Sequence, residues 1–288
     1  MSKHFYIVTV IITILNTTAY SQKIAPSLTN LIVLNNKITN EIEETSGLIL
    51  FDNMLWTFND SGGEACLFAL NRYSHAIERK VYIDNAQNID WEDITQDDNF
   101  IYIGDVGDNK GARQELHIYK VNKEYLLDKS NKKVSSELIT FSYNDKRKPL
   151  KLSNSAYDCE AIIASNDSIF LFTKNWVHSK SDIYGFPTKQ GKYSIERIKR
   201  IDSEGLITGA CISPDKQYVF LIAYADYTPY MLCLDYSNFK IIGRYEYPQY
   251  AGYQTEAVCF AGKDTILISS EKTAVKPISI LRTIIENK

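Results

Sequence analysis

Apolar and polar positions alternate along this chain in short runs, and each run ends at turn-forming residues. Met54–Phe58 is one such run. It is followed by the turn Asn59–Gly63 and by two further runs, Ala65–Asn71 and Ala76–Ile83. With Thr45–Asp52 as the first member, this predicts four short strands in an antiparallel meander. No segment has the length and periodicity of a substantial helix.

The four-strand pattern repeats along the chain, and each copy begins at a small or polar residue. The first strands of the copies start at Ser46, Glu92, Glu160, Thr208 and Glu256. The spacing is 46 residues from the first start to the second and 48 between each of the last two pairs. It is 68 between the second and third, where a polar insert, Asn122–Lys133, accounts for most of the excess. Repetition at this period is typical of β-propellers.

The fifth copy has only three strands, whereas an isolated strand pattern, Leu28–Ile38, lies near the N-terminus. We expect this strand to complete the last blade, because closure of the ring removes the free sheet edge. The sequence therefore predicts an all-β fold, a five-bladed β-propeller. A six-bladed ring is the alternative if one weak blade is hidden. In the third copy we expect Tyr193–Ile201 to form the outermost strand.

The first residues have the features of a secretory signal. A short basic segment precedes the apolar run Phe5–Leu15, and Ala19 and Ser21 supply small residues for cleavage before Gln22. We predict a signal peptide at 1–21, a single propeller domain at 22–288, no membrane span after cleavage, and a secreted or periplasmic monomer. An uncleaved anchor is the alternative.

Composition removes some classes of function. The net charge of −3 comes with no basic stripe, so we expect no nucleic acid polymer as partner. Five cysteines lie in apolar segments at spacings that match no zinc motif, which predicts buried free thiols, with one incidental disulfide as the alternative. No GxSxG, HExxH, P-loop or EF-hand motif is present. Whether the protein is an enzyme stays open.

The starts of the innermost strands carry the strongest chemical signal. In a propeller these starts surround one mouth of the central channel, so residues distant in sequence converge there. Carboxylates this close cannot all stay ionised without a counter-charge, and calcium accepts carboxylate and hydroxyl oxygens. We predict calcium as a cofactor. The ring that would bind it consists of Ser46, Glu92, Glu160, Thr208 and Glu256. The alternative is that these side chains hydrogen-bond the backbone of neighbouring blades.

Further polar and aromatic residues follow the second and third strands on the same face. The predicted ligand-binding residues are Asp60, Asp108, Asn109, Lys174, Tyr224, Asp226, Tyr253 and Glu271. Asp105 and Glu92 are the candidates for a catalytic carboxylate. Turn chemistry is the alternative role of Asp105 and Asp108, since Asp binds its own backbone in turns. Packing at the blade rims is the alternative role of the tyrosines.

Several motifs resemble those of secreted bacterial propellers, the group of SdiA-regulated and phytase-like propeller proteins. They are ETSGL at Glu44–Leu48, WEDI at Trp91–Ile94, GDVGDN at Gly104–Asn109, DCEAI at Asp158–Ile162, FTKN at Phe172–Asn175, ITGACISPD at Ile207–Asp215 and TEAV at Thr255–Val258. The ring order of hydroxyl, Glu, Glu, hydroxyl, Glu is also similar to that of calcium-activated nucleotidases. The second resemblance implies a five-bladed propeller with one oxygen ligand per blade around an axial calcium.

Two classes of function follow. The first is a calcium-binding propeller whose acidic mouth holds a small molecule, glycan or peptide. The second is a calcium-dependent hydrolase, acting on phosphoesters as nucleotidases and phytases do, or on lactones. The nucleotide-contacting loops of the nucleotidases have no match in this chain.

Overall fold

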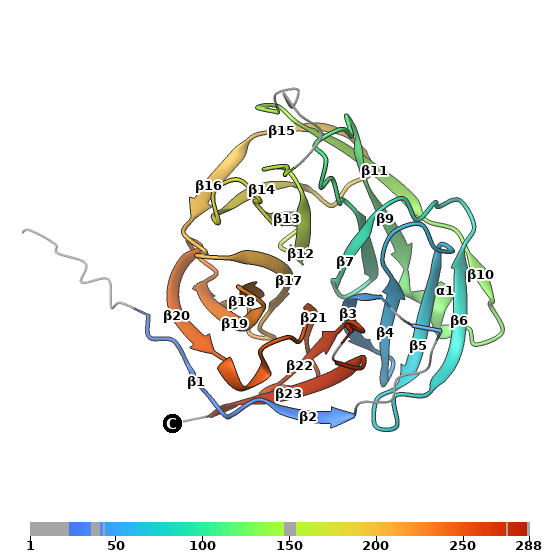
Figure 1. Ribbon diagram of the computed structural model, residues 1–288. Helices are drawn as coiled ribbons and strands as arrows, with labels where there is room; N and C mark the ends of the chain where they lie inside the picture. Colours follow the sequence, from blue (N-terminus) through green and yellow to red (C-terminus); the bar gives the residue numbers. More distant parts are fainter. Residues whose placement is uncertain (1–22, 36–40, 43, 147–153, 275, 287–288) are drawn as a thin grey trace, which may run out of the picture.

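Five β-sheets form a closed ring around a central channel (Figure 1). The computed structural model describes residues 23–35, 41, 42, 44–146, 154–274 and 276–286. The predicted all-β, five-bladed propeller is confirmed, and the six-bladed alternative is wrong. The predicted signal peptide lies outside the described residues. Within them, no helix has the length and apolar character that crossing a membrane requires.

The blades follow one another in chain order, each with its first strand on the channel. Blade 1 contains β3 (Thr45–Phe51), β4 (Met54–Asn59), β5 (Cys66–Asn71) and β6 (Ile77–Ile83); blade 2 contains β7 (Trp91–Gln96), β8 (Phe100–Asp105), β9 (Leu116–Asn122) and β11 (Glu137–Tyr143); blade 3 contains β12 (Cys159–Ser165), β13 (Ser168–Thr173), β14 (Ser181–Pro187) and β16 (Arg197–Ile201); blade 4 contains β17 (Leu206–Ile212), β18 (Tyr218–Ala225), β19 (Thr228–Asp235) and β20 (Lys240–Glu246); blade 5 contains β21 (Thr255–Phe260), β22 (Thr265–Ser270) and β23 (Ser279–Glu286).

Blade 5 is completed by the N-terminal segment, as predicted. Both β1 (Ser27–Leu28) and β2 (Ile32–Asn35) pair antiparallel with β23, so the first described residues lie beside the last (Figure 1). The expected single strand Leu28–Ile38 is therefore two short strands, and residues 36–40 lie outside the described residues. Leu31, between the two strands, is buried in the apolar layer that blades 4 and 5 share. The N-terminal segment thus closes the ring by backbone pairing and by packing.

Each pair of neighbouring blades encloses one apolar layer. The five buried clusters fall between blades 1 and 2, 2 and 3, 3 and 4, 4 and 5, and 5 and 1. The largest aromatic side chains lie in these layers. Phe58 of blade 1, for example, meets Trp91 of blade 2 edge to face, with ring centroids 5.3 Å apart. Burial of apolar area between blades, at about 25 cal/mol per Å², is the main force that holds the ring.

Three hairpins, two between the first and second strands of a blade and one between the second and third, turn through two residues with left-handed backbone. The pairs are Asp52 and Asn53, Asn166 and Asp167, and Asp226 and Tyr227, each with φ between 48° and 59°. Two successive residues of this kind match the twist of the flanking strands, and Asn and Asp tolerate the conformation better than most residues. Such turns fix the register that places the strand starts on one face.

Two outer strands differ from prediction. The expected strand Tyr193–Ile201 is divided into β15 (Gly191–Ile195), which pairs parallel with β11 of blade 2, and β16. The polar insert contains a short helix, α1 (Lys123–Leu127), and leads into β10 (Lys133–Val134), which pairs parallel with β6 of blade 1. A later segment of the chain thus covers the outer edge of each of these blades, as exposed sheet edges require. The pattern of single strands does not encode this exchange.

All five cysteines are buried and free, as predicted. Burial raises the pKa of the Cys66 thiol to about 11 and that of Cys233 to about 12. Thiols in this state behave as small apolar groups.

Candidate functional site

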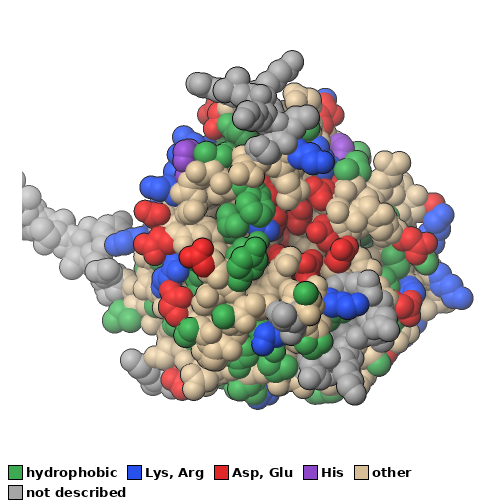
Figure 2. Space-filling model, viewed as in Figure 1, with side chains coloured by type: hydrophobic (Ala, Val, Ile, Leu, Met, Phe, Trp, Pro, Cys, Tyr) green, Lys and Arg blue, Asp and Glu red, His purple; other side chains and the backbone are tan. Residues whose placement is uncertain are grey.

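The starts of the innermost strands meet at one mouth of the channel. Six acidic residues line a cavity of about 340 Å³ there: Asp60, Asp90, Glu92, Glu160, Glu256 and Glu271. Lys174 is the basic residue among the lining side chains, which come from all five blades. Figure 2 shows the acidic side chains gathered in the central hollow of this face. The sequence prediction of an acidic channel mouth thus agrees with the geometry.

A β-bulge positions the ring residue in each of blades 2 to 5. The pairing of the first two strands skips Glu92, Glu160, Thr208 and Glu256. A bulge leaves its extra residue unpaired and re-aims the side chain. In blade 1 the shift follows Ser46 directly and includes Gly47, whose φ is 67°. A Cβ on Gly47 would lie 2.8 Å from the Ile94 nitrogen, so this bulge requires glycine.

The two hydroxyl members of the ring connect neighbouring blades. Ser46 Oγ donates a hydrogen bond to the Glu92 carbonyl, and Thr208 Oγ1 donates to the Thr255 carbonyl at 2.6 Å. These contacts correspond to the hydrogen-bonding alternative of the sequence analysis. Thr208 does not line the cavity, whereas Ser46 does.

Lys174 supplies a positive charge inside the ring. Its Nζ lies 2.6 Å from Glu160 Oε2, and both side chains are buried. The ammonium also lies 5.0 Å from the Trp176 ring centroid and 5.4 Å from that of Tyr224. Burial acts to lower the pKa of Lys174, but the carboxylates of Glu160 and Glu256 outweigh it and hold the pKa well above its ordinary value. Lys174 is therefore a permanent cation of the site.

One ammonium does not neutralise the remaining carboxyls. Burial, reinforced by the neighbouring carboxylates, raises the pKa of Asp90 to about 7 and that of Glu271 to about 9. Burial also raises the pKa of Asp60 to about 6, and burial followed by the charge of Glu160 raises the pKa of Glu92 well above its usual range. Such a site gains free energy by taking up protons or a cation.

Two sets of carboxylates are close enough to share one cation. Ligand oxygens of Asp60, Asp90 and Glu92 lie within 4.8 Å of one another, and so do those of Glu92, Asp158 and Glu160. In the second set, Glu160 is paired with Lys174, and Asp158 accepts hydrogen bonds from the Asp108 nitrogen at 2.6 Å and the Trp176 indole at 2.7 Å. The first set has the more available oxygens.

Gly107 of the GDVGDN motif packs directly against the first set. A Cβ at this position would lie 2.2 Å from Glu92 Oε1 and 2.4 Å from Asp90 Oδ2. The glycine backbone thus forms one wall of the carboxylate group. Its nitrogen donates to the Asp90 carbonyl at 3.2 Å, which fixes this wall to the strand start.

Sequence analysis missed five residues of the mouth. Ser61, Asp90, Trp176 and Gln254 line the cavity, and Asp158 lies beside it. Asp90, Gln254 and Asp158 each stand two positions before a ring residue, Glu92, Glu256 and Glu160 respectively. This spacing recurs in three blades, and it is the signal that could have identified them.

Asp93 was also missed as a structural residue, and it lies at the centre of the ring of blades. Its side chain has no exposed surface. Oδ2 accepts hydrogen bonds from the Ile162 nitrogen at 2.8 Å and the Ala210 nitrogen at 3.3 Å, and Oδ1 accepts one from the Ile94 nitrogen at 2.8 Å. One carboxylate therefore joins the inner strands of blades 2, 3 and 4. The corresponding position holds Gly or Ala in the other four copies, so nothing in the repeat predicted it.

Asp105 and Asp108 lie outside the cavity lining. Asp105 is fully buried, accepts a hydrogen bond from the Asp90 nitrogen at 3.0 Å, and lies 2.9 Å from Arg113 Nη2. Asp108 forms an ion pair with Lys146 and accepts a hydrogen bond from the Arg113 nitrogen at 3.0 Å. These contacts agree with the turn-chemistry alternative. Asn109 does line the cavity and donates to Asp158 Oδ2 at 3.2 Å.

Two other predicted ligand-binding residues also lie outside the acidic cavity. Asp226 is exposed in the turn between β18 and β19, because the two-residue hairpin carries it away from the axis. Tyr253 lies in a neighbouring, mostly apolar pocket of about 290 Å³. Tyr224 lines both spaces.

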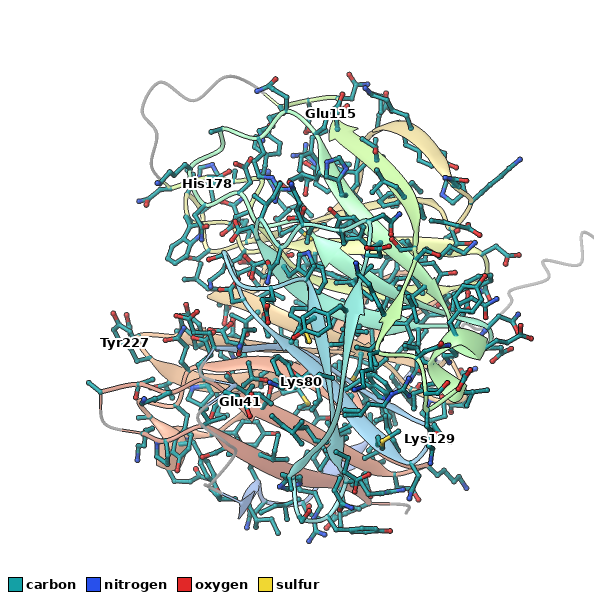
Figure 3. The ribbon with its side chains drawn as sticks, turned by 90° about the vertical axis from the view of Figure 1, so that its right-hand side faces the viewer. Glu41, Lys80, Glu115, Lys129, His178 and Tyr227 are labelled. Carbon is teal, nitrogen blue, oxygen red and sulfur yellow. The ribbon has the colours of Figure 1, made fainter. Side chains whose placement is uncertain are left out.

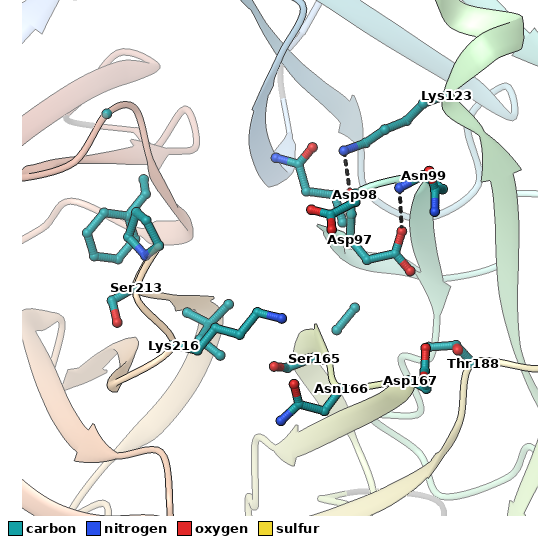
Figure 4. A pocket seen from close by; sticks show the side chains of 16 residues that line it. Asp97, Asp98, Asn99, Lys123, Ser165, Asn166, Asp167, Thr188, Ser213 and Lys216 are labelled. Atoms are coloured by element: carbon teal, nitrogen blue, oxygen red, sulfur yellow. Dashed lines mark hydrogen bonds between the residues drawn. The ribbon is translucent and has the colours of Figure 1, made fainter.

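A larger hollow of about 640 Å³ lies at the other ends of the inner strands. Two of its charged residues are used within the protein. Asp97 Oδ1 accepts hydrogen bonds from the nitrogens of Asn99 and Phe100, and its Oδ2 accepts one from the Tyr102 hydroxyl. Lys123 Nζ donates to the Asp97 carbonyl (Figure 4). Three acidic residues, Asp97, Asp98 and Asp167, line this hollow, compared with six at the acidic mouth.

Comparisons with known proteins support the fold alone. No protein family matches the sequence, and no curated protein does. A glucose dehydrogenase structure aligns over 90% of this chain and 100% of its own, with a TM-score of 0.54 and 8% identity. A second glucose dehydrogenase aligns over the same shares with a TM-score of 0.51 and 9% identity.

The calcium-binding protein regucalcin from Agrobacterium tumefaciens strain C58 aligns more weakly. It covers 89% of this chain and 95% of its own, with a TM-score of 0.45 and 13% identity. An alignment this weak says nothing about a metal here. The finer resemblance to the SdiA-regulated and phytase-like propellers, and to the calcium-activated nucleotidases, stays a prediction.

Proposed function

We propose that the protein is a secreted, calcium-binding propeller whose acidic mouth binds a small organic ligand. The observation that carries the calcium proposal is the group formed by Asp60, Asp90 and Glu92, whose oxygens lie within 4.8 Å of one another. Two oxygens bound to one calcium at about 2.3–2.6 Å can lie at most about 5 Å apart, so the group fits around a single ion.

The surroundings of this group favour a divalent cation. Lys174, the cation of the cavity, is paired with Glu160 and leaves these three carboxyls without a counter-charge of their own. Oxygen donors alone, on a partly exposed rim, suit calcium better than a transition metal. A secreted protein meets calcium at concentrations that match the weak affinities, about 10⁻⁴–10⁻³ M, of extracellular modules.

The substitution Glu92→Gln is expected to weaken calcium binding at least tenfold, which corresponds to about 1.4 kcal/mol. Glu92 belongs to both carboxylate groups, and its amide would keep the shape but lose the charge. Isothermal titration of the purified protein with calcium measures the change. Glu115→Gln is the matched control, because Glu115 is exposed and paired with Lys192 on the surface. The proposal would be contradicted if titration with calcium gave no heat of binding and the protein unfolded at the same temperature in calcium and in EDTA.

A calcium-dependent hydrolase is the second candidate, favoured by a carboxyl of the cavity that stays protonated at neutral pH. Glu271, with a pKa of about 9, would donate a proton to a leaving group. Calcium, when bound, would polarise the scissile bond. Of the two candidates named from sequence, Glu92 lines the cavity and Asp105 does not.

For the hydrolase, we expect turnover that falls as the pH rises through about 9, the pKa of Glu271, because a general acid must be protonated. The measurement is a panel of nucleotides, phytate, aryl phosphates and lactones, assayed with calcium and with EDTA. Glu271→Gln is expected to lower turnover and to remove this pH-dependent fall. If no compound on the panel is hydrolysed above the rate of a buffer blank, the binding function stands alone.

A further inference from the structure

On the side of blades 4 and 5, the acidic cavity lies next to the apolar pocket that contains Tyr253. The two spaces share Tyr224 and Gln254, and Tyr227 contributes to the outer wall of the apolar pocket. Tyr227 is 77% exposed and projects from the same face as His178 (Figure 3). A molecule in this region would thus contact carboxylates at one end and tyrosine rings at the other.

One buried carboxylate oxygen at the junction is unused. Glu256 is 5% exposed, and among the described residues no hydrogen-bond donor reaches its Oε1. A buried acceptor without a partner costs about 1–3 kcal/mol, so a ligand that supplies a donor is favoured here. The neighbouring Glu271 accepts a hydrogen bond from Gln254 Nε2 at 2.6 Å, which places a second carboxyl beside the junction.

We propose that this junction binds an organic ammonium ion with a neutral aromatic arm. The ammonium would donate to Glu256 Oε1 and Glu271, and the arm would lie against Tyr224 and Tyr253. The proposal rests on the proposed ligand-binding role of the mouth. It uses carboxylates other than Asp60, Asp90 and Glu92, the calcium group proposed from the structure, so the two proposals can fail separately.

The lysines of the site already use the tyrosine rings, since Lys174 Nζ lies 5.4 Å from the Tyr224 ring centroid and Lys276 Nζ lies 4.7 Å from that of Tyr253. The carboxyls of Glu256 and Glu271 would therefore attract the incoming ammonium, and the rings would contact its neutral arm. Because Lys276 covers one face of Tyr253, a second positive charge at the outer end would be repelled. A monoamine therefore fits better than a polyamine.

The experiment compares 2-phenylethylamine with 2-phenylethanol by calorimetry on the purified protein. The two probes share the aromatic arm and differ in the cationic head. We expect the amine to bind at least tenfold more tightly than the alcohol, in calcium and in EDTA. Equal affinities, or binding of neutral methyl glycosides in place of the amine, would overturn the proposal.

Two variants locate the binding. Glu256→Gln and Tyr253→Ala are each expected to weaken amine binding at least fivefold and to change calcium affinity far less than amine affinity. Tyr125→Ala is the matched control, because Tyr125 is a 45% exposed tyrosine on α1, outside both spaces. Amine binding that persists in a protein without calcium affinity would contradict the calcium proposal alone. Calcium binding without amine binding would contradict this one alone.

Discussion

Replacing Asp93 by alanine is expected to destabilise the protein by about 3 kcal/mol or more, since each buried donor left unpaired costs about 1–3 kcal/mol. The substitution removes the acceptor of three backbone N–H groups, those of Ile94, Ile162 and Ala210. These groups belong to three different blades and lie in a core where Asp93 has no exposed surface. Burial raises the pKa of Asp93, and the three backbone hydrogen bonds act against this rise.

Equilibrium unfolding in urea measures the loss as a lower midpoint. Asp98→Ala is the control, since Asp98 is an exposed acid in the turn between β7 and β8 of the same blade. Should the alanine variant not fold, Asp93→Asn keeps one oxygen acceptor and is expected to lose less. If Asp93→Asn and Asp93→Ala both unfolded at the midpoint of the unsubstituted protein, Asp93 would not hold the blades together.

Much of the fold was predictable because each blade repeats one local pattern. The strand starts, the two-residue turns and the closure by the N-terminal segment all follow from alternation and turn chemistry. The outer strands β10 and β15 were not predictable. They pair with a blade other than the one that follows from chain order, and such pairing depends on tertiary contacts rather than on local sequence.

The candidate site was predictable in position and less so in detail. Glu92, Glu160 and Glu256 converge because the bulge recurs at the same place in each blade. Lys174 was predicted at the mouth as a ligand-binding residue, but its pairing with Glu160 was not foreseen, because the two residues belong to different strands and meet only in the folded blade. Asp105 was nominated for its motif, but its pairing with Arg113 reflects a turn and not the cavity.

Lys174→Met is expected to destabilise the protein by about 3–5 kcal/mol at neutral pH, as for a buried ion pair that loses one partner. Methionine retains much of the apolar stem but leaves the buried Glu160 carboxylate without its counter-charge. The double variant Lys174→Met with Glu160→Gln is expected to recover most of the loss, because it removes both charges. Lys180→Met is the control. Lys180 pairs with Asp202 on the surface, and exposed pairs contribute about 0–1 kcal/mol.

The pH dependence separates charge from packing in the Lys174→Met variant. Burial already raises the pKa of Glu160, and Lys174 acts to lower it, so removal of the ammonium moves the folded-state pKa further up. A carboxyl whose pKa is higher in the folded state than in the unfolded state loses stability as the pH rises above its unfolded value of about 4.3. The loss in free energy of unfolding caused by Lys174→Met should therefore be small near pH 4 and grow toward pH 8. In the double variant position 160 does not titrate, so this pH-dependent loss should be absent. If the loss in free energy of unfolding were equal at both pH values, and if the double variant did not reduce it, the effect would come from the packing of the lysine stem.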